Sequence, residues 1–250
     1  MTHRTFYEFL LKSPQRFNLA VRHTVSYMNN QASRTNMVKQ QLRTGDVLNE
    51  TILALYNEIA RDEFVPNQFK HFAYSDMQID LPHHQRMMTP LEEAKLLQAL
   101  ALRGGEVVLE VGTGTGFLTA LLSRLCKKVI SVDYYPDFTL QARRLLTEHQ
   151  RANVELVTGD GSQGWLDLAP FDVIVFTGAM EQLTDIQRLQ LLPGGKLFAI
   201  IGKQPVMQGQ LHTLDHNGHW TRQVVFETCI PPLVDQLKYT NFDFQDKVRC

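Results

Sequence analysis

The sequence predicts an α/β fold built on a doubly wound, mostly parallel sheet that ends in an antiparallel hairpin. Apolar runs of strand length alternate with segments of helical spacing through the middle of the chain, as expected for a parallel sheet with helices on both faces. After Gly209 the period changes, and two strand-like runs flank Asn217-Gly218, a pair that favours a tight hairpin turn. The chain has 250 residues, of which 44% are hydrophobic, so we expect one domain with a substantial core.

The individual elements follow from apolar periodicity and turn residues. The predicted parallel strands are 107–111, 128–133, 154–160, 171–176 and 196–201, and the hairpin strands are 211–214 and 220–226. The predicted helices are 47–60, 117–126, 137–150 and 184–192. The first of them has one apolar face made of Val47, Leu48, Ile52, Leu55 and Ile59. Pro193-Gly194-Gly195 should end the last, and a further helix should begin at Pro90 inside a capping box formed by Thr89 and Glu92.

The most informative stretch runs from Val107 to Phe117, where an apolar strand leads through Glu110 into three alternating glycines. Glycine lets the backbone approach a ligand where a Cβ would clash, and the helix behind it begins with unpaired N–H groups. A dinucleotide site needs the spacing G-x-G-x-x-G. Phe117 occupies the third glycine position, so the NAD pattern fails. A glycine-rich turn without any ligand is the alternative interpretation.

Two further carboxylates follow strands in positions that suit a nucleoside. Asp133 closes the second strand about 20 residues after Gly112, where a carboxylate can accept both ribose hydroxyls. Asp160 ends the third strand between Gly159 and Gly161. A single Asp after a strand is often only a turn residue, but three matching strand ends in order indicate a nucleoside site.

The pattern E-x-G-x-G-x-G at residues 110–116 resembles the first motif of the S-adenosylmethionine (SAM) methyltransferases. The resemblance implies their Rossmann-like fold and SAM as the cofactor. It also implies that Asp133 binds the ribose and that Asp160 faces the adenine amino group. The cofactor-binding residues it predicts are Glu110, Gly112, Thr113, Gly114, Gly116, Asp133, Asp160 and Gly161.

A narrower resemblance comes from other parts of the chain. Residues 36–43, 64–66, 73–76 and 157–161 are similar to motifs of the protein-L-isoaspartate O-methyltransferases, and 227–233 resembles the tail of a bacterial branch carried under that name. The resemblance covers about residues 36–235. It implies a SAM-dependent enzyme that methylates isoaspartyl carboxylates in damaged peptides or proteins.

One departure from this family falls in its substrate loop, which reads G-x-G-Q-T-I-S-x-P and whose Ser is the active-site residue. With the prolines aligned, Gln85 matches the Gln, Arg86 replaces the Thr and Met88 replaces the Ser. The neighbouring Thr89 offers a hydroxyl, although the capping box predicts that it binds a helix N-terminus. The candidate catalytic residues are therefore Gln85, Met88 and Thr89. Met88 and its neighbour Met87 also predict an apolar, adaptable lining.

The missing hydroxyl changes the expected substrate more than the expected chemistry. A carboxylate is already ionised at neutral pH and needs no general base, and positioning alone can lower the barrier by several kcal/mol. A lost buried hydrogen bond is worth about 1–3 kcal/mol. Two alternatives stay open: a related methyltransferase for a small, more apolar carboxylate or hydroxyl compound, and a SAM-binding sensor or partner subunit with little catalysis.

The composition of the chain argues against nucleic acid and membranes as partners. The net charge of −1 gives no electrostatic reason to expect nucleic acid, and no apolar run is long enough to span a membrane. Three widely separated cysteines, Cys126, Cys229 and Cys250, indicate a reducing compartment and a cytoplasmic protein, with Cys126 in the core. We expect a monomer.

We also expect no metal, because His83-His84 has no further ligand at suitable spacing and is interpreted as a loop at the pocket mouth. Surface positions are expected for His212, His216 and His219.

The chain divides into four predicted parts. Residues 1–35 form an N-terminal extension, 36–90 a helical substrate-facing segment, 91–235 the SAM-binding core and 236–250 a tail. The first 36 residues hold five Lys or Arg and one acid, Glu8, which is compatible with a transit-like or membrane-surface segment. We favour a flexible or docking extension that SAM binding does not require.

Overall fold

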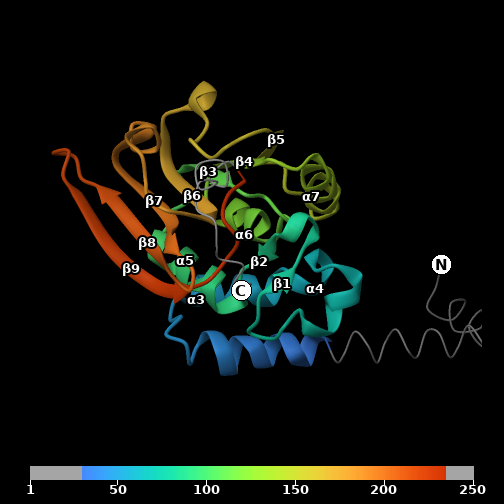
Figure 1. The fold of residues 1–250 in the computed structure, drawn as a ribbon. Coiled ribbons are helices and arrows are strands. Elements are labelled where there is room, and N and C mark those ends of the chain that lie inside the picture. Colours follow the sequence, from blue (N-terminus) through green and yellow to red (C-terminus); the bar gives the residue numbers. More distant parts are fainter. Residues whose placement is uncertain (1–29, 235–250) are drawn as a thin grey trace, which may run out of the picture.

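The computed structural model describes residues 30–234, and a seven-stranded sheet runs through them in the order β5-β4-β3-β6-β7-β8-β9 (Figure 1). The strands are β3 (Val107–Val111), β4 (Lys128–Asp133), β5 (Val154–Thr158), β6 (Phe171–Met180), β7 (Leu191–Lys203), β8 (Val206–Leu214) and β9 (Trp220–Thr228). Strands β3 to β7 pair in parallel, and β8 and β9 are antiparallel. The predicted α/β fold with its C-terminal hairpin is confirmed.

Helices precede and connect the strands. The α-helices are α3 (Glu50–Glu58), α4 (Arg61–Phe64), α5 (Pro90–Leu100), α6 (Phe117–Leu125), α7 (Pro136–Glu148) and α8 (Asp185–Arg188). A π-helix, η1 (Val38–Leu42), and three 3-10 helices, η2 (Asn67–Phe72), η3 (Pro82–His84) and η4 (Leu166–Leu168), are also present. A separate two-stranded ribbon pairs β1 (Ile79–Asp80) with β2 (Arg86–Met87). This ribbon closes the loop in which the family's substrate residues are expected.

The strand order reverses beside β3, which fixes where a ligand can bind. The chain moves from β3 to β4 and β5 on one side and then returns to place β6 on the other side. In open α/β sheets the crevice at such a switch point, outside the carboxyl ends of the strands, receives the ligand. The glycines that follow β3 lie at this point.

The sheet is buried on both faces, as the unbroken apolar runs of β3 and β4 predict. Val108 and Val129 belong to the larger core, which also contains residues of α3, α5, α6 and α7. Leu109 and Ile130 belong to a second core on the opposite face, which includes the partly buried Trp165. Because a core packs on each face of the central strands, the ends of these strands are held rigidly.

The helical residues 30–37 pack against the segment that follows them. The Asn30 amide donates to Asp62 at 2.8 Å, and Arg34 donates to the Tyr74 hydroxyl at 3.2 Å and to the Asn57 carbonyl at 3.0 Å. Met37 is 1% exposed. The last residues of the predicted extension therefore contact the body of the protein. Residues 1–29 and 235–250 lie outside the described residues, and the boundary at residue 35 stays a prediction.

Two predicted element boundaries are wrong. The helix predicted at 184–192 is limited to α8, and β7 begins at Leu191, so Pro193-Gly194-Gly195 lies inside the strand. Leu191 pairs with Phe171, and the next pair is Val173 with Lys196. The residues between them bulge out of the ladder, and a bulge tolerates a proline without an N–H donor.

The first predicted helix is shorter than expected. It starts only after Asn49, whose side chain accepts the backbone N–H groups of Thr51 and Ile52. Leu48 consequently precedes the helix and is 66% exposed, so its place on the apolar face was wrong. Capping by Asn49 explains the difference, since an Asn at this position satisfies the first helical donors.

Two further interpretations need correction. His212 is buried, not at the surface, because it lies on β8 beneath neighbouring side chains. Cys229 is disulfide-bonded, so the cysteines do not support the predicted reducing compartment. Cys126 is a buried free thiol, as predicted.

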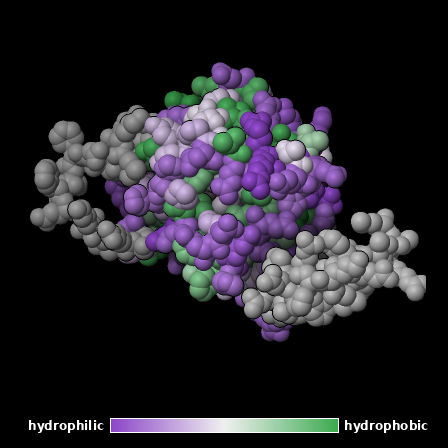
Figure 2. All heavy atoms as spheres, turned by 90° about the vertical axis from the view of Figure 1, so that its right-hand side faces the viewer, coloured by the Kyte–Doolittle hydropathy of each residue, from purple (hydrophilic) through white to green (hydrophobic). Residues whose placement is uncertain are grey.

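The molecular surface on the side of α4 and α7 is mainly hydrophilic, with scattered apolar residues (Figure 2). Among residues 30–234, no helix combines the length and apolarity that a membrane crossing requires.

Candidate functional site

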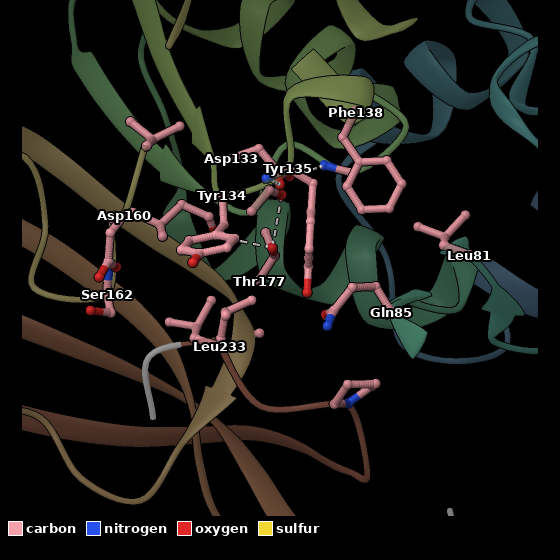
Figure 3. Close-up of a pocket in the computed structure, with 18 of the residues that line it drawn as sticks. Leu81, Gln85, Asp133, Tyr134, Tyr135, Phe138, Asp160, Ser162, Thr177 and Leu233 are labelled. Carbon is pink, nitrogen blue, oxygen red and sulfur yellow. Dashed lines mark hydrogen bonds between the residues drawn. The ribbon is translucent and has the colours of Figure 1, made fainter. Parts of the chain in front are cut away.

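A cavity lies outside the carboxyl ends of β3, β4 and β6 (Figure 3), and we call it the main cavity because most of the predicted cofactor residues line it. The residues that follow these strands and β5 line it: Val111, Gly112, Gly114, Val132, Asp133, Tyr134, Tyr135, Asp160, Gly161, Ser162, Thr177 and Gly178. Leu81, Gln85, Arg86, Phe138, Ile230, Pro231, Leu233 and Val234 complete the wall. The cavity thus coincides with the switch point of the sheet, and most of the predicted cofactor residues surround it.

Gly112 is required by the packing between β3 and β6. Its φ is +99°, and a Cβ there would lie 2.1 Å from the Thr177 hydroxyl oxygen. That hydroxyl donates to the carbonyls of Val111 at 3.1 Å and Gly112 at 2.9 Å. Thr177 therefore joins the two central strands at the cavity floor, and only glycine fits opposite it.

The Asp133 carboxylate holds the turn together from the end of β4. One oxygen accepts the backbone N–H of Gly114 at 2.8 Å, and the other accepts that of Tyr135 at 2.9 Å. Burial raises the pKa of this carboxyl, and the two N–H groups oppose the rise. Each oxygen keeps a second lone pair, so the carboxylate can accept further hydrogen bonds from a ligand in the cavity.

Asp160 and Ser162 lie together on the side of the cavity opposite Gln85 and Leu81 (Figure 3). Asp160 is exposed and accepts the Ser162 backbone N–H at 2.9 Å. A Cβ on Gly161 would lie 2.8 Å from Val111, so this turn packs directly on the end of β3. The two carboxylates, Asp133 and Asp160, follow adjacent strands, as a nucleoside site requires.

A contact that the sequence does not reveal ties the 81–89 loop to α7. The His83 ring stacks on Tyr135 with centroids 3.9 Å apart and planes 4° apart, and its Nε2 lies 2.9 Å from the Asp137 carboxylate. We call these three residues the His83 clasp. His83 does not line the main cavity itself, but its ring joins the loop to Tyr135 in the cavity wall. Its place at the pocket mouth stays a prediction.

A smaller hollow adjoins the main cavity and shares Leu81, Arg86, Gly112, Gly114 and Thr177 with it. Its other lining residues are Met87, Met88, Glu93, Thr113, Thr115, Phe117 and Leu118. Met88 is 4% exposed and stands in the wall of this hollow. Gln85 lines only the main cavity. The lining of the smaller hollow is thus mixed, with apolar side chains beside three threonines, one basic and one acidic side chain.

The acidic side chain, Glu93, pairs with a fully buried arginine. Arg61 Nε lies 3.4 Å from the Glu93 carboxylate, and the guanidinium also donates to the carbonyls of Met88 at 2.7 Å and Ala73 at 3.1 Å. Burial raises the pKa of Glu93 to about 7, and Arg61 opposes this rise. Arg61 therefore fixes the backbone of Met88 from beneath the hollow.

Sequence reasoning missed Thr177, Arg61 and Glu93. Glu93 carried a usable signal, because it lies four residues before Leu97 on the apolar face of a predicted helix, where an acid is unusual. Arg61 and Thr177 act through partners far away in the sequence, and no local pattern indicates them.

Three predicted site residues line neither cavity. Glu110 is fully buried and accepts the hydroxyls of Thr119 at 2.5 Å and Ser131 at 2.6 Å, and burial raises its pKa to about 7. It lies inside β3, where both faces of the sheet are covered. Its role as a cofactor ligand is therefore not supported.

The other two residues shape helix starts. Gly116 is the N-cap of α6 with φ +84°, and a Cβ there would lie 3.0 Å from Ala142 on α7. The Thr89 hydroxyl accepts the Glu92 N–H at 3.2 Å, and the Glu92 carboxylate accepts the Thr89 N–H at 2.7 Å. The capping box is confirmed, and Thr89 is not available as a substitute for the missing serine.

The segment after β9 closes the cavity. The Ala179 N–H donates to the Pro231 carbonyl at 3.0 Å, and the Leu233 N–H donates to the Ala179 carbonyl at 2.9 Å. Residues 230–234 thereby run beside the end of β6 and bring Ile230 and Leu233 into the cavity wall. Within residues 30–234, no group of three or more His, Cys, Asp or Glu side chains is placed to hold a metal ion.

Comparisons with known proteins agree with this geometry. A family model described as protein-L-isoaspartate(D-aspartate) O-methyltransferase matches residues 32–238. A protein-L-isoaspartate O-methyltransferase of Methanoculleus marisnigri is 34% identical over 203 residues, which cover 81% of this chain and 92% of the relative.

Solved structures give the same assignment. A protein-L-isoaspartate O-methyltransferase superposes with a TM-score of 0.71 at 25% identity and covers 82% of this chain and 67% of its own. A Plasmodium falciparum protein provisionally assigned to that enzyme class, solved with S-adenosyl-L-homocysteine, has the same fold, with a TM-score of 0.68 at 17% identity and coverage of 80% and 97%. From its sequence motifs, its fold and these matches, the chain belongs to the protein-L-isoaspartate(D-aspartate) O-methyltransferase family, a family of SAM-dependent methyltransferases.

Proposed function

We propose that this protein uses SAM to methylate the free carboxylate of isoaspartyl residues in damaged peptides and proteins. The observation that carries the proposal is the pair of adjoining cavities. One has a glycine turn between two strand-end carboxylates, and the other contains an arginine suited to a carboxylate substrate.

The main cavity fits SAM in its donor chemistry. Asp133 would accept the ribose hydroxyls, and Asp160 would accept the adenine amino group. The backbone around Gly112 and Gly114 offers an approach free of Cβ atoms, which suits the amino-acid end of the molecule. SAM supplies a sulfonium-bound methyl group that a nucleophile can take by direct displacement. Glu110 and Gly116 would support this site without touching the cofactor.

The smaller hollow fits the substrate carboxylate. Its wall reaches the glycine turn, and Arg86 lines both cavities, so a carboxylate held by Arg86 would face the cofactor site. Asp80, the cross-strand partner of Arg86, accepts its Nε–H at 2.8 Å and orients the guanidinium. An arginine has five donors, so this bond is compatible with one to a substrate. Arg86 would thus supply the positioning contact that the family's hydroxyl residues provide.

Binding and orientation are the main tasks of the protein in this reaction. The nucleophile is ionised without help at neutral pH, so Glu93 is not needed as a base. Arg61 neutralises Glu93 from the side away from the hollow, which limits its repulsion of an incoming carboxylate. Gln85, at the mouth of the main cavity, would contact the peptide backbone.

Methyl transfer from labelled SAM to an isoaspartyl peptide tests the proposal, with the same peptide carrying normal aspartate as the control. We expect turnover of the isoaspartyl peptide alone. An Arg86→Gln variant should raise KM for the peptide about tenfold or more, since a hydrogen bond to a charged group is lost, and should leave SAM affinity unchanged. Arg144→Gln, on the exposed surface of α7, is the matched control.

Other outcomes would select the alternatives. Turnover of a small apolar carboxylate or hydroxyl compound, with none of the peptide, would assign a different substrate to the same cofactor site. Tight SAM binding without any turnover would indicate a sensor or partner subunit. A cytoplasmic location, a monomeric state and the absence of nucleic-acid partners stay predictions from the sequence.

A further inference from the structure

A second, separate pocket lies on the sheet between α8 and the β8–β9 hairpin. Its lining consists of Gln182, Leu183, Arg188, Ile201, Gln210, His212, Trp220, Thr221 and Arg222. It shares no residue with the two cavities described above. Its lining has two arginines and a histidine but no acid, although the whole chain has a net charge of −1. We call it the basic pocket.

The floor of the basic pocket is polar where a core face would be apolar. Gln210 and His212 alternate along β8 and are 5% and 8% exposed. His212 Nε2 lies 3.1 Å from the Gln210 amide oxygen, and the Gln210 amide donates to Gln208 at 3.1 Å. Their register partners on β7, Ala199 and Leu197, are buried and apolar. These side chains bond to one another, which offsets the cost of their burial and gives the pocket a polar floor.

Two guanidinium groups stand over this floor. Arg222 is the direct cross-strand partner of His212, and Arg188 reaches in from α8 with its guanidinium 5.6 Å from the centre of the Trp220 ring. Burial lowers the pKa of His212, and both arginines lower it further. The two positive groups are therefore close enough to act on the same imidazole.

The charge of Arg188 is only weakly neutralised within the described residues. Its Nε is buried without a hydrogen-bond partner there. Asp185 is 3.8 Å from its Nη1, but the Asp185 side chain is 92% exposed, and such a pair is weak in water. Nε itself is closed to solvent, but the Arg188 side chain is 39% exposed, so the pocket presents its other guanidinium N–H groups to an anionic acceptor.

We propose that the basic pocket is a binding site for an oxyanion, a carboxylate or phosphate group. Arg188 and Arg222 supply the charge, and the Gln210 amide lies in the same lining as a further donor. Planar guanidinium groups match the geometry of carboxylate and phosphate oxygens. The site is independent of the proposed methyl transfer, because none of its residues lines the cofactor or substrate cavity.

Titration of the full-length protein with inorganic phosphate and, separately, with acetate tests this proposal. The readouts are calorimetry and the NMR resonances of the His212 ring. We expect saturable binding of at least one anion, and a pKa of His212 that rises when the anion binds, because an anion favours the imidazolium. The anion that binds more tightly identifies the natural chemistry as phosphate or carboxylate.

An Arg188→Gln/Arg222→Gln variant should weaken this binding about tenfold or more. The matched Arg143→Gln/Arg144→Gln variant on α7 should leave it unchanged. Arg222→Gln alone, at an exposed position, provides the same comparison if the double variant does not fold. No saturable binding of either anion, or binding that the Arg188 and Arg222 changes do not weaken, would overturn the assignment.

Discussion

At the scale of single residues, acidic side chains that look alike in the sequence have different surroundings in the fold. Glu110 lies within β3 and is covered on both sides, whereas Asp133 ends β4 and reaches the cavity. Glu110 is the register partner of Ser131, so Asp133 lies two residues nearer the carboxyl edge of the sheet, where the cavity is. A motif match alone assigns both to the cofactor, and the structure separates them.

Asp133→Asn should weaken SAM binding by about 10- to 100-fold. The variant keeps an acceptor for the Gly114 N–H but loses the charge that strengthens bonds to the ribose, and a charged hydrogen bond contributes about 1.5–3 kcal/mol. Calorimetric titration with SAM measures the change, and Asp167→Asn, an exposed position, is the control. Equal affinity in the Asp133 variant would show that this carboxylate does not bind the ribose.

Glu110→Gln should change how stability depends on pH. The ordinary pKa of a Glu carboxyl is 4.5, and burial raises that of Glu110 to about 7. Between these values the folded chain binds more protons than the unfolded chain, so stability falls as pH rises through the window. The amide removes this loss, on the order of 3 kcal/mol.

Urea unfolding at pH 5 and pH 8 checks this prediction. The Glu110→Gln variant should gain stability relative to the parent at pH 8 and much less at pH 5. Glu148→Gln, on the exposed face of α7, should follow the parent at both values. A constant difference between variant and parent across the range would contradict the raised pKa.

Met88→Ser should raise methylation of an isoaspartyl peptide. A recovered buried hydrogen bond of about 1–2 kcal/mol corresponds to roughly a five- to thirty-fold faster reaction. Rates are compared at equal concentrations of folded protein, because the smaller side chain leaves a cavity. Met77→Ser, at a position that is 42% exposed, is the control. A slower reaction in the Met88 variant would mean that the methionine itself contributes to the peptide site.

At the scale of elements, the sequence predicts best what depends on neighbouring residues. Strands β3 and β4, the start of α6 behind its glycines and the capping box of α5 were all confirmed, since each follows from a local pattern. The start of β7 was wrong because pairing with β6 draws Leu191 into the sheet despite the helical pattern before it. Tertiary pairing prevails over local propensity there.

In the candidate site too, the sequence predicts the residues that follow a local pattern and misses those that depend on tertiary contacts. Gly112, Gly114, Asp133, Asp160 and Gly161 reach the main cavity as expected, because strand ends in a parallel sheet meet at one edge. The His83 clasp could not be predicted. It depends on left-handed backbone at His83, with φ +59°, and on a ring stack with a residue about 50 positions away.

His83→Ala should open the clasp and weaken SAM binding about three- to ten-fold, with little change in kcat. Loss of a ring stack and a partly exposed ion pair is worth roughly 1 kcal/mol, and the loop then covers the cavity less firmly. His84→Ala is a close control, because His84 also has positive φ and is exposed but makes no ring stack or ion pair within residues 30–234. Equal SAM affinities of the two variants would show that the clasp does not hold the cofactor side.

At the scale of the whole molecule, the N-terminal extension separates into a part that contacts the body and a part beyond the described residues. A chain that starts at Asn36 lacks the bonds of Asn30 and Arg34. We expect its Tm to fall by about 2–4 °C per kcal/mol lost, while SAM binding stays within about twofold, because these bonds lie outside the cavity wall.

A chain that starts at Asn30 serves as the control and should keep the Tm of the full chain. Scanning calorimetry and SAM titration of the three chains give the comparison. A chain from Asn36 that no longer binds SAM would show that the first helical residues are needed to form the site.

The segment 230–234 can complete the cavity only after the strands of the sheet have been synthesised. It belongs to the cavity wall, yet it follows all seven strands of the sheet in the chain. During synthesis the sheet can therefore assemble before the wall exists, and a nascent chain that ends at β9 has no complete site for a ligand. Binding stabilises only a state that can bind. The cofactor can consequently stabilise the sheet through the complete site only after residues 230–234 have been made and have packed beside β6.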